Sequence, residues 1–134
     1  MPLAKVLLDH ELSPDALAVF REMRELRKTD YVNNIWRVLA NNPELLRRTW
    51  DQAKTVMQPG GLDAVTKEMI YIAVSAANQC NYCLHTHAAA ARAKGMTEEM
   101  MSELMAVIAL ASQTNAIATS YQVETDAKYL NPMG

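Results

Sequence analysis

Two cysteines and two histidines fall within eight consecutive residues of this chain, in the stretch CNYCLHTH. They are Cys80, Cys83, His85 and His87, which account for both cysteines and two of the three histidines of the sequence. Thiols and imidazoles this close together can bind a metal, carry out redox chemistry, or simply pack in a core.

Helical spacing separates these alternatives. At about 100° per residue, Cys83 and His87 fall within about 60° of Cys80, whereas His85 lies about 140° away on another face. A zinc site of two Cys and two His on one helix would need His85 on the shared face. Structural zinc sites also draw their ligands from two separated pairs, so the pattern disfavours a metal site.

The redox alternative has a specific mechanism. The C-x-x-C spacing places two sulfur atoms one helical turn apart, within reach of a disulfide. One cysteine can attack an oxidant to form a sulfenic acid, and the other can condense with it. A helix start lowers the pKa of a thiol, which favours Cys80 as the more acidic of the two. His87, one turn beyond Cys83, can take or supply a proton.

Caps and apolar spacing predict helices around these residues and no strand. Ser13, Asp63 and Thr97 are expected N-caps, and Gly95 is the expected end of the cysteine-bearing helix. The expected helical segments are 13–28, 31–43, 43–57, 62–78, 80–95, 97–113 and 115–130, with the last two open as one helix or two. Half of the residues are apolar and only 6% are aromatic, so we expect an all-α fold in a single domain over 1–134.

Charge and hydropathy exclude several partners. The net charge is −2 and no dense basic cluster occurs, so we expect no nucleic-acid or membrane partner. The N-terminal stretch lacks the pattern of a secretory signal, and no window of about 18 apolar residues occurs, so a cytoplasmic protein is the expectation. The apolar segment 100–112 in so short a chain indicates contact between subunits.

The segment from Glu68 to Gly95 resembles the AhpD-like alkylhydroperoxidase branch of the carboxymuconolactone decarboxylase family. The pattern of that branch is Glu, eleven residues, Cys, two residues, Cys, three residues, His. Glu68, Cys80, Cys83 and His87 match it at that spacing. The resemblance is strong from Leu62 to about residue 111 and weak before Pro59.

The resemblance implies an all-α fold built around a helical hairpin, in an obligate homo-oligomer, trimer or hexamer. It implies reduction of peroxides without metal or other cofactor, with an external dithiol, lipoyl or thioredoxin-like, as the reductant. Cys83 would attack the peroxide, Cys80 would resolve the sulfenic acid, and Glu68 and His87 would complete a proton relay. Tyr82 stands where members often carry a second histidine, and its phenol can supply one hydrogen bond in its place.

Other readings stay open at this stage. A cofactor-free decarboxylase of the same fold would leave the two thiols unexplained, and a redox sensor would form the disulfide without turnover. Taken alone, Glu68 is expected at the surface beside Lys67. An antiparallel hairpin would place Glu68 away from the cysteines, whereas a steep crossing after Asn78 would bring it close.

Overall fold

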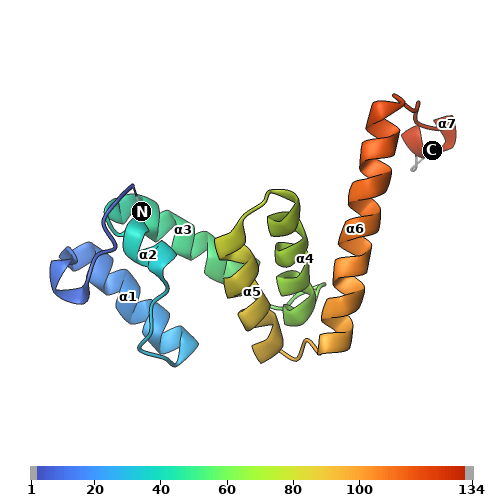
Figure 1. The fold of residues 1–134 in the computed structure, drawn as a ribbon. Helices are drawn as coiled ribbons and strands as arrows, with labels where there is room; N and C mark the ends of the chain where they lie inside the picture. Colours follow the sequence, from blue (N-terminus) through green and yellow to red (C-terminus); the bar gives the residue numbers. More distant parts are fainter. Residues whose placement is uncertain (1–2, 132–134) are drawn as a thin grey trace. The chain divides into compact units, whose positions relative to one another are not determined.

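The computed structural model describes residues 3–131, which divide into two compact units, 3–58 and 59–131. Both units are helical, and the described part of the chain contains no strand (Figure 1). The all-α prediction is therefore confirmed. The expectation of a single domain stays a prediction, and each unit is described by itself below.

The first unit packs two long helices across an apolar core. Its elements are a 3₁₀ helix η1 (Asp9–Glu11), α1 (Pro14–Arg27), α2 (Asn34–Leu39) and α3 (Pro43–Val56). Phe20 and Met23 of α1 and Leu46 and Trp50 of α3 are almost completely buried. Trp36 of α2 meets Trp50 edge to face, with ring centroids 5.8 Å apart. The second expected helix is shorter than predicted, because residues 31–33 are extended or irregular before the helix begins.

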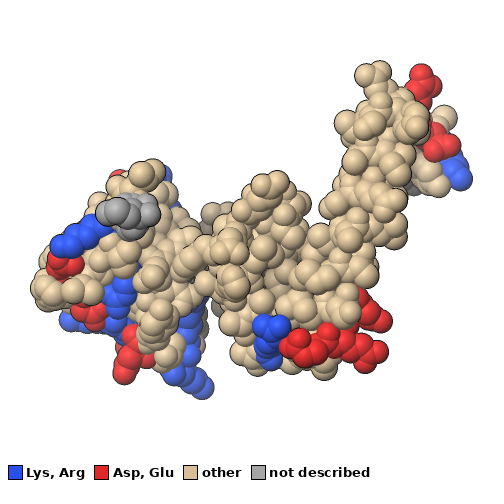
Figure 2. Space-filling model, viewed as in Figure 1, with Lys and Arg blue, Asp and Glu red and all other residues tan. Residues whose placement is uncertain are grey.

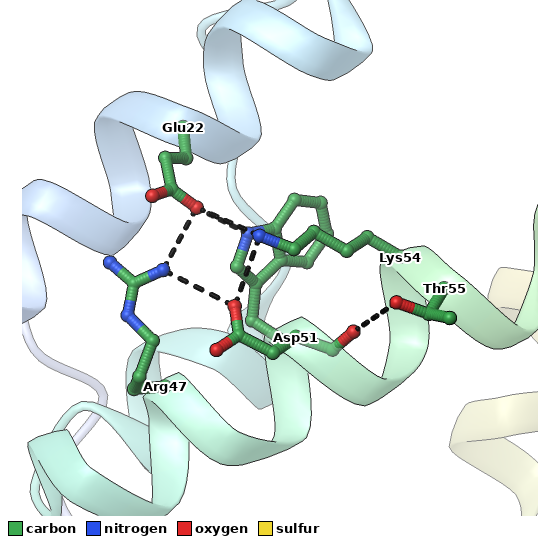
Figure 3. Close-up of polar contacts among 6 residues, drawn as sticks. Glu22, Arg47, Asp51, Lys54 and Thr55 are labelled. Atoms are coloured by element: carbon green, nitrogen blue, oxygen red, sulfur yellow. Dashed lines mark hydrogen bonds and ion pairs between the residues drawn. The ribbon is translucent and has the colours of Figure 1, made fainter.

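A cluster of polar side chains links α1 and α3 (Figure 3). One carboxylate oxygen of Glu22 accepts hydrogen bonds from Arg47 (2.9 Å), from the indole N–H of Trp50 (3.1 Å) and from Lys54 (3.4 Å). Asp51 pairs with both Arg47 and Lys54. These contacts lower the pKa of Glu22, with the hydrogen bond from Arg47 as the largest cause. The cluster therefore fixes how the two helices align.

The second unit contains a helical hairpin, which confirms that element of the predicted fold (Figure 1). Its helices are α4 (Ala64–Ala77), α5 (Asn81–Ala93), α6 (Glu98–Ser120) and α7 (Ala127–Leu130). α4 and α5 lie side by side, and α6 packs against α4. Ile72, Ala91 and Met96 are buried at the centre of this unit, and Met101 and Leu104 of α6 pack on them.

Local signals set the limits of these helices. The side chains of Asp63, Cys80 and Thr97 each accept a backbone N–H at the start of a helix, as N-caps do. Gly95 follows α5 with φ of 108°, the conformation that favours glycine at a helix end. The N-caps expected at Asp63 and Thr97 are confirmed, and so is the end of α5 near Gly95.

The C-terminal prediction is partly wrong. α6 is one continuous helix to Ser120, but residues 121–126 are not helical, so the expected helix over 115–130 is interrupted. Gln122 adopts a left-handed conformation, with φ of 50°, and the N–H of Val123 bonds the carbonyl of Ala118. This is the hydrogen bond of a Schellman motif, which ends a helix.

Residues 104–111 of α6 present an apolar surface. From Leu104 to Val123 the sequence contains no charged residue, and the side of α6 in view in Figure 2 shows none over that stretch. Val107 and Leu110 are 63% and 61% exposed, and Met105 and Ile117 are also exposed. Contiguous exposed apolar residues of this kind mark interaction surfaces.

α4 also ends in a Schellman motif, which forms the turn to α5. The N–H of Cys80 bonds the carbonyl of Ser75 at 2.9 Å, and Gln79 takes the left-handed position with φ of 57°. A side chain at that position costs free energy that glycine would not, because its Cβ crowds the backbone.

We expect Gln79→Gly to raise the free energy of unfolding by about 0.5–1 kcal/mol, since relief of the left-handed strain outweighs the extra chain entropy of glycine. Urea denaturation followed by circular dichroism measures the change. Gln52→Gly is the matched control, because Gln52 is exposed within α3, where glycine should destabilise. An equal loss of stability in both variants would show that Gln79 is not strained.

Candidate active site

The hairpin carries the four predicted site residues and joins them in two separate contacts, Glu68 with His87 and Cys80 with Cys83. Glu68 comes from α4, Cys80 caps α5, and Cys83 and His87 lie within α5. The turn at Gln79 determines which residues of α4 and α5 lie opposite each other. Tyr71 and His87, for example, are each eight residues from it. Cys80 is therefore at the closed end of the hairpin, with His87 and Glu68 further along it.

Glu68 is buried, with 4% of its surface exposed. One oxygen lies 2.7 Å from Nδ1 of His87, and the other accepts a hydrogen bond from Nζ of Lys94 at 2.6 Å. Its expected surface position beside Lys67 is therefore wrong, because the side chain turns into the hairpin. Burial alone would raise the pKa of Glu68, but the hydrogen bonds from His87 and Lys94 outweigh it and lower the pKa.

Two side chains contact the ring of His87, Glu68 at Nδ1 and Tyr71 on the ring face. Because an ionised carboxylate can only accept, the contact with Glu68 assigns the proton to Nδ1 of His87. The ring of Tyr71 stacks on His87, with centroids 3.6 Å apart and planes 19° apart. Nε2 is thus the ring nitrogen left for proton exchange in the neutral form. His85 is exposed, on the other face that helical spacing predicts.

The two cysteines are free thiols and partly buried. The sulfur of Cys80 accepts the backbone N–H of Cys83 at 3.4 Å. A hydrogen bond from the thiol of Cys83, together with the N–H groups at the helix start, lowers the pKa of Cys80. Burial, and then the hydrogen bond to Cys80, raise the pKa of Cys83 to about 11. Cys80 is therefore the more acidic thiol of the pair, as the helix-start reasoning predicts.

This difference predicts selective alkylation. We expect iodoacetamide near neutral pH to modify Cys80 before Cys83, because the thiolate reacts and the lowered pKa of Cys80 gives it the larger thiolate fraction. The labelling rate of Cys80 should reach its plateau at a lower pH than that of Cys83. The rate of Cys83 should keep rising up to a pH of about 11. Peptide mass spectrometry under single-hit conditions measures both rates, with urea-unfolded protein as the control. Equal rates in the folded protein would contradict this order.

Sequence reasoning did not single out three side chains of this region. Lys94 bonds Glu68, Tyr71 stacks on His87, and Ser75 lies within hydrogen-bond reach of Cys83. Pairing residues at equal distances from the turn at Gln79 would have found Tyr71 opposite His87 and Ser75 opposite Cys83. Lys94 follows from no such rule, because it lies beyond the last residue of α5 and reaches back with a long side chain.

The auxiliary residue Tyr82 is 38% exposed at the start of α5. Its backbone N–H is among the groups that lower the pKa of Cys80, so part of its effect comes from the main chain. Replacement of the phenol for a second histidine stays a prediction.

Across residues 3–131, no three His, Cys, Asp or Glu side chains gather closely enough to share a metal ion. Within that range, too, no helix combines the length and apolar character that a membrane crossing requires.

Comparison with known proteins places this chain in a family. Residues 43–125 match the sequence profile of the carboxymuconolactone decarboxylase family. The chain is 33% identical over 98 residues to the alkyl hydroperoxide reductase AhpD of Solibacter usitatus, covering 71% of this chain and 54% of that protein. It is 39% identical over 57 residues to an uncharacterised protein of the cox locus of Paracoccus denitrificans, covering 42% of this chain and 51% of that protein. The chain thus spans about half the length of the curated relatives it matches.

A solved structure is similar over almost the whole length. The crystal structure of the alkylhydroperoxidase AhpD core from Rhodospirillum rubrum is 54% identical in sequence and superposes with a TM-score of 0.94. The match covers 97% of this chain and 98% of that one. Together with the hairpin and its Glu, Cys, Cys and His, these similarities show that the chain belongs to the AhpD-like branch of the carboxymuconolactone decarboxylase family.

Proposed function

We propose that this chain is a thiol-dependent peroxidase that reduces alkyl hydroperoxides or hydrogen peroxide through a Cys80–Cys83 disulfide, in antioxidant defence. The observation that carries the proposal is the contact between the buried Glu68 and the partly buried His87, which lies in the same hairpin as the two thiols. A packing role for the cysteines would not require an oriented imidazole one helical turn beyond Cys83. Peroxide reduction requires a thiolate and a proton donor, and this region offers both.

The oxidation begins with the thiol of Cys83. Its proton moves to the thiolate of Cys80, to which it is already hydrogen-bonded. Cys83 then attacks the terminal oxygen of the peroxide, so that the O–O bond breaks and a sulfenic acid forms on Cys83. The alkoxide that leaves takes the proton now on Cys80 and departs as the alcohol. His87 lies one helical turn beyond Cys83, which favours Cys83 over Cys80 as the attacking thiol.

The disulfide forms in the second step. The thiolate of Cys80 attacks the sulfur of the sulfenic acid, and the S–O bond breaks. The departing hydroxide takes a proton from protonated His87 and becomes water. Overall, the two sulfur atoms lose two electrons, and the peroxide gains them as alcohol and water. Glu68 holds the imidazole by Nδ1, so that Nε2 delivers the proton.

An external dithiol completes the proposed cycle. One of its thiols attacks the disulfide, the second releases the mixed disulfide, and His87 regains its proton. A lipoyl group or a thioredoxin-like protein is the reductant we propose, and a homo-oligomer, trimer or hexamer, is the proposed assembly. The exposed apolar surface of α6 supports the assembly, and a cytoplasmic location stays a prediction from the sequence.

A free-thiol count tests the proposed function directly. Reduced protein is treated with one equivalent of cumene hydroperoxide, and thiols are counted over time. We expect rapid loss of both thiols and their return on addition of a dithiol. If both thiols persist, the peroxidase proposal fails, and a decarboxylase-like lyase, whose activity would survive loss of both thiols, becomes the next function to assay. Disulfide formation without turnover would instead indicate a redox sensor.

A further inference from the structure

Lys94 is the second partner of Glu68 and comes from the end of α5. Its Nζ lies 2.6 Å from Oε1 of Glu68, while His87 occupies Oε2 at 2.7 Å. Both oxygens of the carboxylate are thus bound. One partner is the ammonium group of Lys94, and the other is the imidazole of His87, a group that can gain and lose a proton in catalysis. The two partners therefore have different consequences for the buried charge of Glu68.

The position of Lys94 is fixed by the helix end. Its backbone N–H bonds the carbonyls of Ala90 and Ala91, both at 3.1 Å, so the residue remains attached to the last turn of α5. A cation is favoured there, because the C-terminal end of a helix carries partial negative charge. Arg92, two residues earlier, pairs with Glu98 at 2.8 Å, whereas Lys94 pairs with Glu68.

The surroundings of Glu68 make a compensating cation necessary. The α4 side supplies Tyr71, and the α5 side supplies His87, Lys94 and, further along, the thiols. α6 meets the hairpin with apolar side chains, namely Met100, Met101 and Leu104. A carboxylate buried to this degree is costly unless it is paired with a cation.

We propose that Lys94 is a positioning residue of the redox site, which keeps Glu68 charge-compensated while His87 gives up and regains its proton. This proposal rests on the proposed peroxidase function. When His87 is protonated, Glu68 has two cationic neighbours, and when His87 is neutral, Lys94 alone compensates the carboxylate. Without Lys94, release of the proton would leave a buried carboxylate with no cation beside it, so the imidazole would resist acting as the acid.

The first test is kinetic. Reduced protein is mixed with one equivalent of cumene hydroperoxide, and disulfide formation is followed in a single turnover. We expect Lys94→Met to slow the reaction by about tenfold, a part of the roughly 10²- to 10⁴-fold that general acid–base catalysis contributes. Lys94→Arg should restore most of the rate because it keeps the charge. Arg92→Met is the matched control, since it removes a cation from the same helix end and should leave the rate unchanged.

A double-mutant cycle separates positioning from general damage. If Lys94 acts through Glu68, Lys94→Met should have no further effect in a Glu68→Gln background, where no buried charge needs compensation. An equal slowing in both backgrounds would overturn the proposal. If Lys94→Met does not fold, Lys94→Gln takes its place, because it keeps a hydrogen-bond donor without the charge, and the same loss is expected.

The second test does not depend on turnover. The carboxyl ¹³C signal of Glu68 reports its ionisation during a pH titration. We expect Lys94→Met to raise the pKa of Glu68, because loss of the cation leaves burial less opposed. An unchanged titration would overturn the role of Lys94 even if the enzyme is active. A wild-type protein that does not react with peroxide, but whose Glu68 titration shifts in Lys94→Met, would overturn the proposed function and leave the Lys94–Glu68 coupling in place.

Discussion

Cys83→Ser and Cys80→Ser should each lose peroxide turnover with a dithiol by more than about 10³-fold, because both sulfur atoms take part in covalent steps. No other side chain of the hairpin can replace either one as a redox centre. Steady-state consumption of cumene hydroperoxide measures the loss. Thr86→Ser, on the same helix, is the control and should retain activity, because its hydroxyl bonds the carbonyl of Cys83 and a serine can do the same.

The serine variants also identify the attacking thiol. We expect one equivalent of peroxide to leave a sulfenic acid on Cys83 in Cys80→Ser, which dimedone traps and mass spectrometry locates. The wild type should give the disulfide and little trapped adduct. Trapping on Cys80 in Cys83→Ser, with none on Cys83, would reverse the order of the two cysteines and would match the lower pKa of Cys80.

The second large effect concerns assembly. We expect Val107→Glu combined with Leu110→Glu to dissociate the proposed homo-oligomer, because both side chains are more than half exposed on the uncharged stretch of α6. Charges placed inside a subunit contact are buried without partners, and truncation of central contact residues alone costs about 2 kcal/mol or more each.

Sedimentation velocity measures this change as a shift from the mass of a trimer or hexamer to that of one chain. Gln52→Glu is the control, since it adds a charge to an exposed position of α3, which belongs to the first unit. A wild-type protein that already sediments as a single chain would show that the apolar surface of α6 serves another purpose. Unchanged mass in the double variant would place the subunit contact elsewhere.

The elements that the sequence predicts well are those set by neighbouring residues. Asp63 and Thr97 cap their helices by accepting a hydrogen bond from the backbone N–H three residues on, a contact that needs no knowledge of the rest of the fold. The end of α6 depends on a left-handed conformation at Gln122, and glutamine does not signal that conformation as glycine does. For this reason Gly95 marks a helix end in the sequence, whereas the break after Ser120 does not.

The site shows the same division between local and distant contacts. Helical spacing places Cys83 and His87 on one face and His85 on another, and the exposed position of His85 agrees. The burial of Glu68 depends on partners nineteen and twenty-six residues away, which periodicity cannot supply. The resemblance to a family supplied the role of Glu68, whereas Lys94 belongs to no pattern and emerged only from the three-dimensional contacts.

The cap at the start of α5 has a consequence for redox thermodynamics. The sulfur of Cys80 receives the N–H of Cys83, and its pKa is lowered, so the reduced form of the pair is stabilised as a thiolate. A disulfide cannot carry that charge, and oxidation forfeits its stabilisation. Whatever stabilises the dithiol form raises the reduction potential of the couple. We therefore expect a Cys80–Cys83 disulfide to be easier to reduce than a disulfide whose cysteines lack such a helix-start cap.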